Sequence, residues 1–195
     1  MIIYHGSIRK FNHFDKELVV QPFMNDLDTI GFWLTSDIQS AKPFAEGTET
    51  VIEKSRTEFW EDGEPKVVQI DKPVTGYVYK VYIDDPTLKK YEASSEKHSY
   101  EVFMDDRDVF CDYLGAQKRK LTWRDKAILL NKEEANLRFR KHLIKQGYDG
   151  FVIQNTKQYH SGVSDLYCIF SGDSLHIADI WALDELDNNQ QVDEK

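Results

Sequence analysis

Two short segments near the N-terminus combine residue types that can hold a nucleotide. In the first, Tyr4-His5-Gly6-Ser7 follows an apolar run, so a histidine, a glycine and a hydroxyl stand at the end of an expected strand. Histidine can hydrogen-bond a ribose hydroxyl, while glycine lets the backbone come close to an amide of a ligand. In the second, Gly31-Phe32-Trp33-Leu34-Thr35 leads into Ser40-Ala41-Lys42-Pro43-Phe44. Trp33 would end a strand and Phe44, on the following helix, would stand eleven positions later, so both rings can face one flat aromatic ligand.

The order of these segments resembles the ADP-ribosyltransferase family, whose H-G-(S/T) and G-x-Tyr-x-(T/A)-(S/D)…A…(Y/F)-(A/C) motifs build a site for NAD. A later run, Gly147-Tyr148-Asp149-Gly150, is similar to one found in bacterial and phage members of the wider family. The resemblance implies that NAD is the co-substrate, that His5 bonds a ribose hydroxyl and that the Gly6 backbone holds the nicotinamide carboxamide. Trp33 stands where the family has Tyr, a departure that keeps a flat ring for stacking. The implied NAD-binding residues are His5, Gly6, Ser7, Trp33, Thr35, Ser40 and Phe44.

A carboxylate near the ribose is the second requirement that the resemblance implies. Family members break the bond between nicotinamide and ribose through an oxocarbenium-like transition state, so positive charge develops on the sugar. Poly-modifying members place a glutamate at the head of a late strand, E-Y-(I/V)-V-(Y/F)-D, and here that position falls on Leu166 of Leu166-Tyr167-Cys168-Ile169-Phe170. Asp165 can replace the glutamate where a bulge or the end of the preceding loop turns it toward the ribose. We therefore expect His5 and Asp165 as catalytic residues and transfer of a single ADP-ribose unit, with catalysis assisted by the acceptor as an alternative.

The loop before this strand, residues 155–164, helps to choose the acceptor in the family. Here the loop is rich in hydrogen-bond donors, and Tyr159 and His160 are its candidate acceptor-recognition residues. A plain connector is the alternative, because polar loops of this length are common.

The charge distribution bears on the kind of partner. The formal net charge of −9 argues against broad attraction to a nucleic-acid backbone. Residues 116–146 have the opposite charge, with ten basic and three acidic side chains. This basic stretch is either a solvated helical face, the commoner case, or a contact surface for an acidic partner or a polyphosphate. We expect a macromolecular acceptor, with protein favoured and nucleic acid kept as an alternative through residues 116–146.

Composition argues against several other classes. Hydrophobic residues make up 41% of the 195 positions and aromatic residues 13%, as in a globular protein. The two cysteines are too few for a disulfide framework, and the six histidines lack metal-ligand spacing, so no metal site is expected. No apolar run approaches the ~20 residues of a membrane span, and the N-terminus lacks a basic and apolar leader. We expect a cytoplasmic protein without membrane contact.

The expected elements give a single α+β domain over residues 1–183, followed by a disordered acidic tail over 184–195. A helix over 38–46 would be capped by Ser36 or Asp37, and Gly147 would end a later helix in the left-handed conformation. Residues 46–65 would form an irregular excursion or a hairpin, and residues 86–146 a mainly helical insertion. Strands are expected at 1–5, 30–34, 66–71, 76–84, 149–154, 166–170 and 175–180. The resemblance implies the ADP-ribosyltransferase-like fold, with two packed, mainly antiparallel sheets around an NAD cleft.

Three functions follow as hypotheses. The first is an NAD-dependent mono-ADP-ribosyltransferase, a glycosyltransferase of the bacterial or phage toxin, effector or host-takeover type. The second is a degenerate module of the same fold that binds a nucleotide-like ligand or a partner without chemistry, which Leu166 favours. The third is a nucleic-acid-binding protein that uses residues 116–146.

Overall fold

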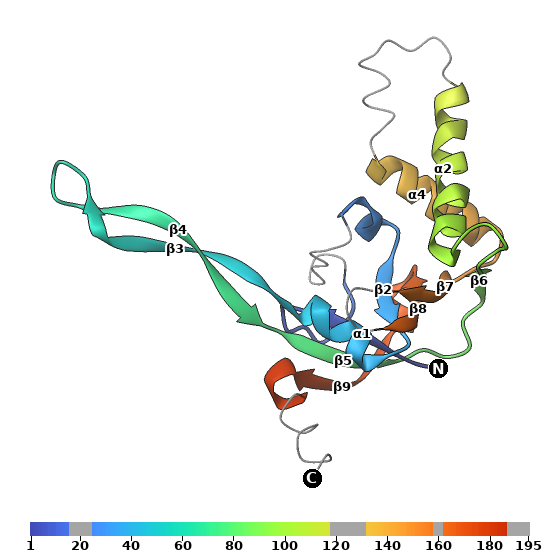
Figure 1. Ribbon diagram of the computed structural model, residues 1–195, viewed down its shortest axis with the longest axis horizontal. Helices are drawn as coiled ribbons and strands as arrows, with labels where there is room; N and C mark the ends of the chain where they lie inside the picture. The colour runs from blue at the N-terminus through green and yellow to red at the C-terminus, as the bar shows by residue number, and fades with distance from the viewer. Residues whose placement is uncertain (16–24, 118–131, 158–161, 187–195) are drawn as a thin grey trace.

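The computed structural model describes residues 1–15, 25–117, 132–157 and 162–186. These residues form an α+β fold with one seven-stranded mixed sheet, in the order β6-β7-β8-β2-β1-β5-β9, and a separate two-stranded ribbon, β3-β4 (Figure 1). The strands of the large sheet are β1 (Ile2–Ser7), β2 (Phe32–Thr35), β5 (Tyr77–Tyr82), β6 (Leu88–Tyr91), β7 (Gly150–Lys157), β8 (Val163–Ile169) and β9 (His176–Ala182). Short 3-10 helices, η1 (Asn25–Thr29) and η3 (Gly172–Ser174), precede β2 and β9.

The large sheet is nearly divided between β1 and β2. These two strands share one registered pair, Tyr4 with Thr35, whereas β1 pairs with β5 along its whole length and β2 pairs with β8 along its whole length. The sheet therefore has two halves, β6-β7-β8-β2 and β1-β5-β9, that meet at a narrow seam. The resemblance implies a second sheet packed against the first. Among the described residues, the second sheet is instead the two-stranded β3-β4 ribbon.

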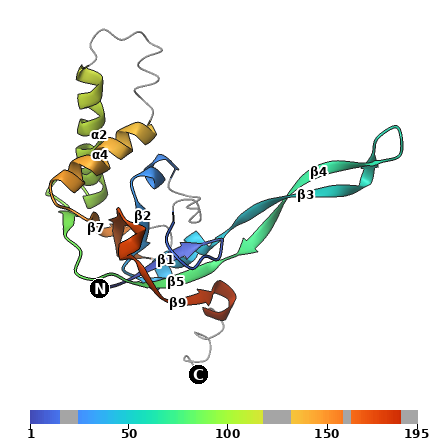
Figure 2. The same ribbon diagram turned by 180° about the vertical axis from the view of Figure 1, so that it is seen from behind.

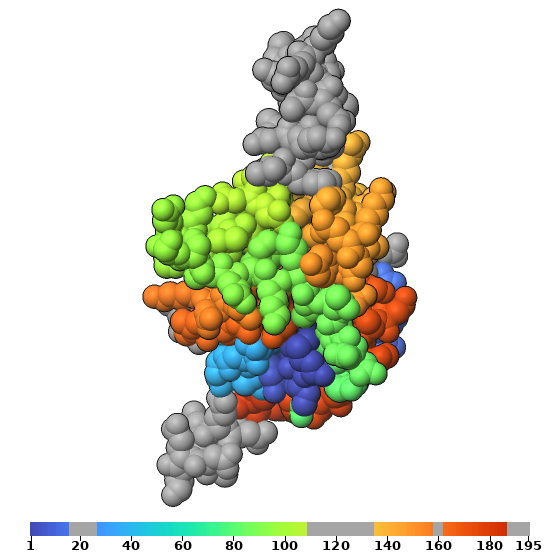
Figure 3. All heavy atoms as spheres, turned by 90° about the vertical axis from the view of Figure 1, so that its right-hand side faces the viewer, coloured from blue at the N-terminus to red at the C-terminus, as the bar shows by residue number. Residues whose placement is uncertain are grey.

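The two faces of the sheet carry different cores, because successive side chains of a strand point to opposite faces. Trp33 and Leu166 lie on the face covered by α2 (Ser99–Gln117) and α4 (Lys132–Lys145), in one cluster with Phe103, Phe139 and Phe151. Ile3, Leu34 and Tyr79 lie on the opposite face, in a second cluster with Phe11 and Phe14. Figures 1 and 2 show both helices on the same side of the sheet. Seen from the end of the molecule, α2, α4 and the segment that contains β6 form one continuous surface (Figure 3).

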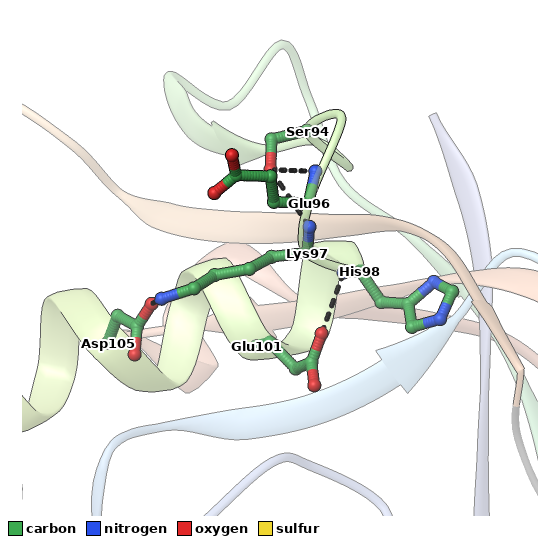
Figure 4. Close-up of polar contacts among 6 residues, drawn as sticks. All are labelled: Ser94, Glu96, Lys97, His98, Glu101 and Asp105. Atoms are coloured by element: carbon green, nitrogen blue, oxygen red, sulfur yellow. Dashed lines mark hydrogen bonds and ion pairs between the residues drawn. The ribbon is translucent and has the colours of Figure 1, made fainter.

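The start of α2 is fixed by local polar contacts (Figure 4). The Ser94 hydroxyl accepts hydrogen bonds from the backbone N–H groups of Glu96 and Lys97, which tightens the preceding turn. The carboxylate of Glu101 accepts from the His98 N–H at 2.9 Å, as in one half of a capping box. Lys97 forms an ion pair with Asp105, which raises the pKa of the lysine.

The expected helical insertion over 86–146 differs from the structure at its start. Helices α2 and α4 are present, but β6 precedes them and pairs in parallel with β7. The segment Leu88-Lys89-Lys90-Tyr91 is too short and too polar to be recognised as a strand from the sequence. It becomes a strand through its backbone pairing with β7. Gly147 follows α4 with φ +88°, which confirms the expected left-handed end. Residues 118–131 lie outside the described residues.

The expected helix over 38–46 is shorter in the structure. It consists of α1 (Ile38–Ala41) followed directly by the 3-10 helix η2 (Lys42–Ala45). Asp37 is the cap, as expected, and its carboxylate accepts a hydrogen bond from the Ser40 N–H. Pro43 lies in η2, where it lacks an N–H for continued helical bonding.

The stretch expected as an excursion or hairpin is a long antiparallel ribbon, β3 (Glu46–Phe59) and β4 (Pro65–Thr75). It extends from the sheet on the side away from α2 and α4 (Figures 1 and 2). Among the described residues, no helix is both long and apolar enough to cross a membrane.

Candidate functional site

The three segments that carry the resemblance meet on three adjacent strands. The segments around His5, Trp33 and Asp165 lie on β1, β2 and β8, which are neighbours in the order β8-β2-β1. Residues far apart in sequence are thus brought to the two sides of the β1–β2 seam. The direction of each side chain then decides which of them can act together.

His5 lies at the seam, where its ring bonds across from β1 to β2. Its Nδ1 is 2.8 Å from the carbonyl oxygen of Trp33. Because a carbonyl can only accept, Nδ1 carries the proton, and Nε2 carries the lone pair of a neutral imidazole. Nε2 is buried, and no group of the described residues forms a hydrogen bond with it. Burial lowers the pKa of His5 to about 4, although the bond to the Trp33 carbonyl acts in the opposite direction.

The surroundings of His5 are aromatic. The rings of Phe11 and Phe14 meet the imidazole edge to face, at centroid distances of 5.8 and 5.4 Å, and Tyr79 lies at 6.1 Å. The Tyr79 hydroxyl accepts from the Phe11 N–H and donates to the Arg9 carbonyl, which holds this segment over the histidine. Burial raises the pKa of Tyr79 to about 12, so the hydroxyl keeps its proton. His5 is only 3% exposed in this arrangement.

The stacking slot expected between Trp33 and Phe44 is not formed. Trp33 is 5% exposed, its ring packs edge to face against Phe103 and Phe151, and its indole N–H donates to the Leu27 carbonyl. Phe44 lies on η2, beside Gly6 of β1. Trp33 therefore belongs to the core under α2 and α4. Because the helices cover this face of the sheet, the ring is not accessible for stacking on a ligand.

Gly6 and Ser7 are occupied by contacts within the protein. A Cβ on Gly6 would lie 2.0 Å from the Ala41 carbonyl oxygen and 2.9 Å from the Phe44 Cβ, so the glycine permits the close approach of α1 and η2 to β1. The Ser7 hydroxyl is buried and accepts from the Arg9 N–H. Both residues shape the turn out of β1.

Thr35 and Ser40 belong to a network of hydroxyls at the end of β2. The Thr35 hydroxyl donates to that of Ser164 on β8 at 3.1 Å, within the buried interior. Ser40 donates both its backbone N–H and its hydroxyl to the Asp37 carboxylate. The network joins β2, α1 and β8 next to Asp165.

Asp165 and Leu166 face opposite sides of β8. Strand β8 is regular here, with Leu166 paired to Thr35, and the irregularity lies in β7, between Ile153 and Thr156. Leu166 is therefore buried under the helices with Trp33, whereas Asp165 is half-buried on the other face. The bulge that was expected to reorient Asp165 is in the neighbouring strand instead.

The position of Asp165 is fixed by its neighbours. The Ser36 N–H donates to the Asp165 carbonyl, and the Asp165 N–H donates to the Ser36 hydroxyl. Its carboxylate accepts from the N–H of Asn155, a residue with φ +50°. Burial, together with the Asp165 carboxylate to which its hydroxyl is hydrogen-bonded, raises the pKa of Tyr167.

His5 and Asp165 thus share one face of the sheet, with β2 between their strands. Two inter-strand steps and an offset of two residues along the strands separate their Cα atoms by roughly 12 Å. Sequence reasoning did not find the covering residues Phe11, Phe14 and Tyr79, whose only signal was their aromatic character. It also did not identify Ser36 and Asn155 as the residues that hold Asp165, through their backbone N–H groups and the Ser36 hydroxyl.

Tyr159 and His160, the candidate acceptor-recognition residues, lie outside the described residues. Among the residues that the structure does describe, no group of three or more His, Cys, Asp or Glu side chains could hold a metal ion. Comparisons with protein families, with curated proteins and with solved structures find no match to this chain.

Proposed function

We propose that this protein transfers a single ADP-ribose unit from NAD to a macromolecular acceptor, with protein favoured. The observation that carries the proposal is the buried Nε2 of His5 beside the seam of the sheet, which has no hydrogen-bond partner in the part of the chain that the structure describes. A buried acceptor without a partner is costly, and it is satisfied when a ligand hydroxyl donates to it. A ribose hydroxyl is such a donor.

The spacing of His5 and Asp165 supports a ligand with two sugars. A separation of roughly 12 Å is too wide for one ribose to bond both groups. NAD carries two riboses, so in the proposal His5 bonds one of them and Asp165 lies near the other. The order of β8, β2 and β1 supports the same reading, because it brings the three resembling segments side by side.

The proposed chemical step breaks the bond between the ribose C1′ and the nicotinamide nitrogen. The bonding electron pair stays on nicotinamide, which leaves as a neutral ring, while positive charge develops on the ribose. The Asp165 carboxylate stabilises that charge. A nucleophilic group of the acceptor forms the new bond to C1′ and releases a proton to solvent.

Access to His5 requires a movement in this proposal. Phe11 and Phe14 cover the imidazole, and they belong to the segment that leads into residues 16–24, outside the described residues. NAD would replace the two rings against His5. Such an activity would belong to a bacterial or phage effector that acts in the cytoplasm.

A second candidate function is a degenerate module that binds a nucleotide without turnover. Leu166 favours it, since the position that carries the glutamate in the resembling family is apolar and buried under the helices. The two candidates differ in the fate of NAD, because the degenerate module would bind it and release no nicotinamide.

Incubation of the protein with NAD labelled in the adenylate, together with a bacterial lysate, tests the proposal. Release of nicotinamide and transfer of label to protein are the expected results. The decisive variant is His5→Asn, since the Asn amide can donate to the Trp33 carbonyl as Nδ1 does but offers nothing at the place of Nε2. It should fold and lose transfer.

His13→Asn is the matched control, because His13 is exposed and bonds only its neighbour Asn12 within the described residues. It should keep full transfer. A folded wild-type protein that neither binds NAD nor releases nicotinamide contradicts the proposal, and binding without release selects the degenerate module.

A further inference from the structure

The tip of the β3-β4 ribbon combines exposed aromatic rings with carboxylates. This hairpin tip, residues Phe59–Glu64, holds Phe59 and Trp60 at 53% and 59% exposure. Glu61, Asp62 and Glu64 stand beside them, and among the described residues no ion pair joins these three to a cation.

The tip has a defined shape. The Trp60 N–H donates to the Glu64 carbonyl at 2.7 Å, and the Gly63 N–H donates to the Trp60 carbonyl at 3.0 Å, with φ +84° at Gly63. The Lys66 ammonium lies 5.4 Å from the Trp60 ring centroid and pairs with Glu58. A fixed aromatic anchor surrounded by charge is typical of a binding hot spot.

The outer face of α4 has the complementary character. Leu137 and Ile144 are large apolar residues that remain 37% and 47% exposed on the same side of this helix. Helical spacing puts three exposed cations on that side with them. The outer face of α4 consists of Leu137, Arg138, Lys141, Ile144 and Lys145. It belongs to the described part of the basic stretch 116–146, which the proposed function does not use.

These two surfaces cannot meet within one chain as it is folded. The ribbon extends away from α2 and α4, so its tip lies at the opposite end of the molecule from the outer face of α4 (Figures 1 and 2). A second copy of the chain presents both surfaces again. Two copies related by a twofold axis place each tip on the other copy's α4, so the contact is made twice.

We propose that the protein forms a reciprocal dimer in which the hairpin tip of each copy docks on the outer face of α4 of the other. Phe59 and Trp60 lie against Leu137 and Ile144, and the carboxylates of the tip pair with the cations of α4. The opposite charges set the register, while burial of the aromatic rings supplies most of the affinity.

Cross-linking tests the contact directly. A carbodiimide joins carboxylates to lysine amines without a spacer, and an equal mixture of ¹⁴N and ¹⁵N protein distinguishes links between chains from links within one. The expected product joins Glu61 or Glu64 of one isotope to Lys141 or Lys145 of the other. Links confined to single isotopes, or the absence of this peptide pair, overturn the proposal.

Charge reversal tests which surfaces are responsible. Glu61→Lys with Glu64→Lys makes the tip basic, and Lys141→Glu with Lys145→Glu makes the α4 face acidic. Each variant alone places like charges at both contacts of its dimer, so the dissociation constant in sedimentation should rise at least about tenfold. An equimolar mixture of the two variants has opposite charges at both contacts and should dimerise again.

Glu92→Lys with Glu96→Lys is the matched control, since it makes the same charge change on the exposed loop before α2. It should leave the dimer intact. Trp60→Ala should weaken dimerisation without a charge change. A wild-type protein that is monomeric at its highest soluble concentration overturns the proposal, as does a dimer that survives both reversals.

Discussion

The Nδ1 of His5 lies 2.8 Å from the carbonyl oxygen of Trp33, across the seam where β1 and β2 share one registered pair. A side chain of β1 thus hydrogen-bonds the backbone of β2 where the two strands diverge. The same bond fixes the tautomer, so the histidine points an acceptor, Nε2, into the buried interior. In His5, Nδ1 therefore has the structural role, and Nε2 has the proposed role in binding a ligand.

Substitutions of His5 should therefore separate stability from activity. His5→Ala removes a buried ring and leaves the Trp33 carbonyl without its donor, so the free energy of unfolding should fall by about 2–4 kcal/mol. His5→Asn keeps a donor at the same place and should lose less than half of that. Urea unfolding of both variants measures the difference, and equal losses would show that the bond to Trp33 contributes little.

The stability of the protein should fall as the pH drops below 6.5, in part because of His5. The pKa of His5 is lowered to about 4 in the folded state, so the unfolded chain takes up a proton between pH 6.5 and 4 that the folded chain does not. The stabilisation is complete above pH 6.5 and is lost as the pH falls toward 4. It amounts to about 3 kcal/mol.

Unfolding free energies of the wild type and of His5→Asn, measured from pH 4 to 7.5, check this prediction. Toward pH 4 the wild type should lose about 3 kcal/mol relative to His5→Asn, because carboxylates contribute equally to both proteins. The wild type should therefore be the more stable protein at pH 7.5 and the less stable one near pH 4. A constant difference would mean that His5 has the same pKa in the folded and in the unfolded protein.

Asp165 and Leu166 should respond oppositely to substitution. Asp165→Asn keeps an oxygen that accepts from the Asn155 N–H, so the fold should be unchanged, while nicotinamide release should fall at least about tenfold because the charge is lost. Leu166→Glu puts a carboxylate under the helices, where no ribose can reach it, and should lower the free energy of unfolding by about 3 kcal/mol or more. Thermal unfolding and nicotinamide release are the measurements. A stable Leu166→Glu protein with raised NAD hydrolysis would place the site on the helical face.

Trp33 should behave as a core residue. Trp33→Phe keeps an aromatic ring but leaves the Leu27 carbonyl without the indole donor, so the free energy of unfolding should fall by about 1–3 kcal/mol. Trp60→Phe is the same change on the exposed ribbon and should alter stability by less than about 0.5 kcal/mol. If Trp33→Phe instead weakened NAD binding at unchanged stability, Trp33 would be part of the ligand site.

The sequence by itself determined those helix ends that depend on a few neighbouring residues. Asp37 caps α1 and Gly147 ends α4 as expected, because the cap and the left-handed turn depend on a few neighbouring residues. The α+β class also followed from the succession of periodic segments. By contrast, β6 becomes a strand only through its pairing with β7, which lies far away in the sequence.

What only the tertiary structure decided is the side of the sheet on which each candidate residue lies. A motif gives the residues and their order, but a strand alternates its faces at every step, and the partner strands determine which face is covered. For this reason Trp33 and Leu166 are buried beneath α2 and α4, while His5 and Asp165 lie on the other face. The tautomer of His5 was equally beyond the sequence, since it depends on a hydrogen bond to the Trp33 carbonyl of another strand.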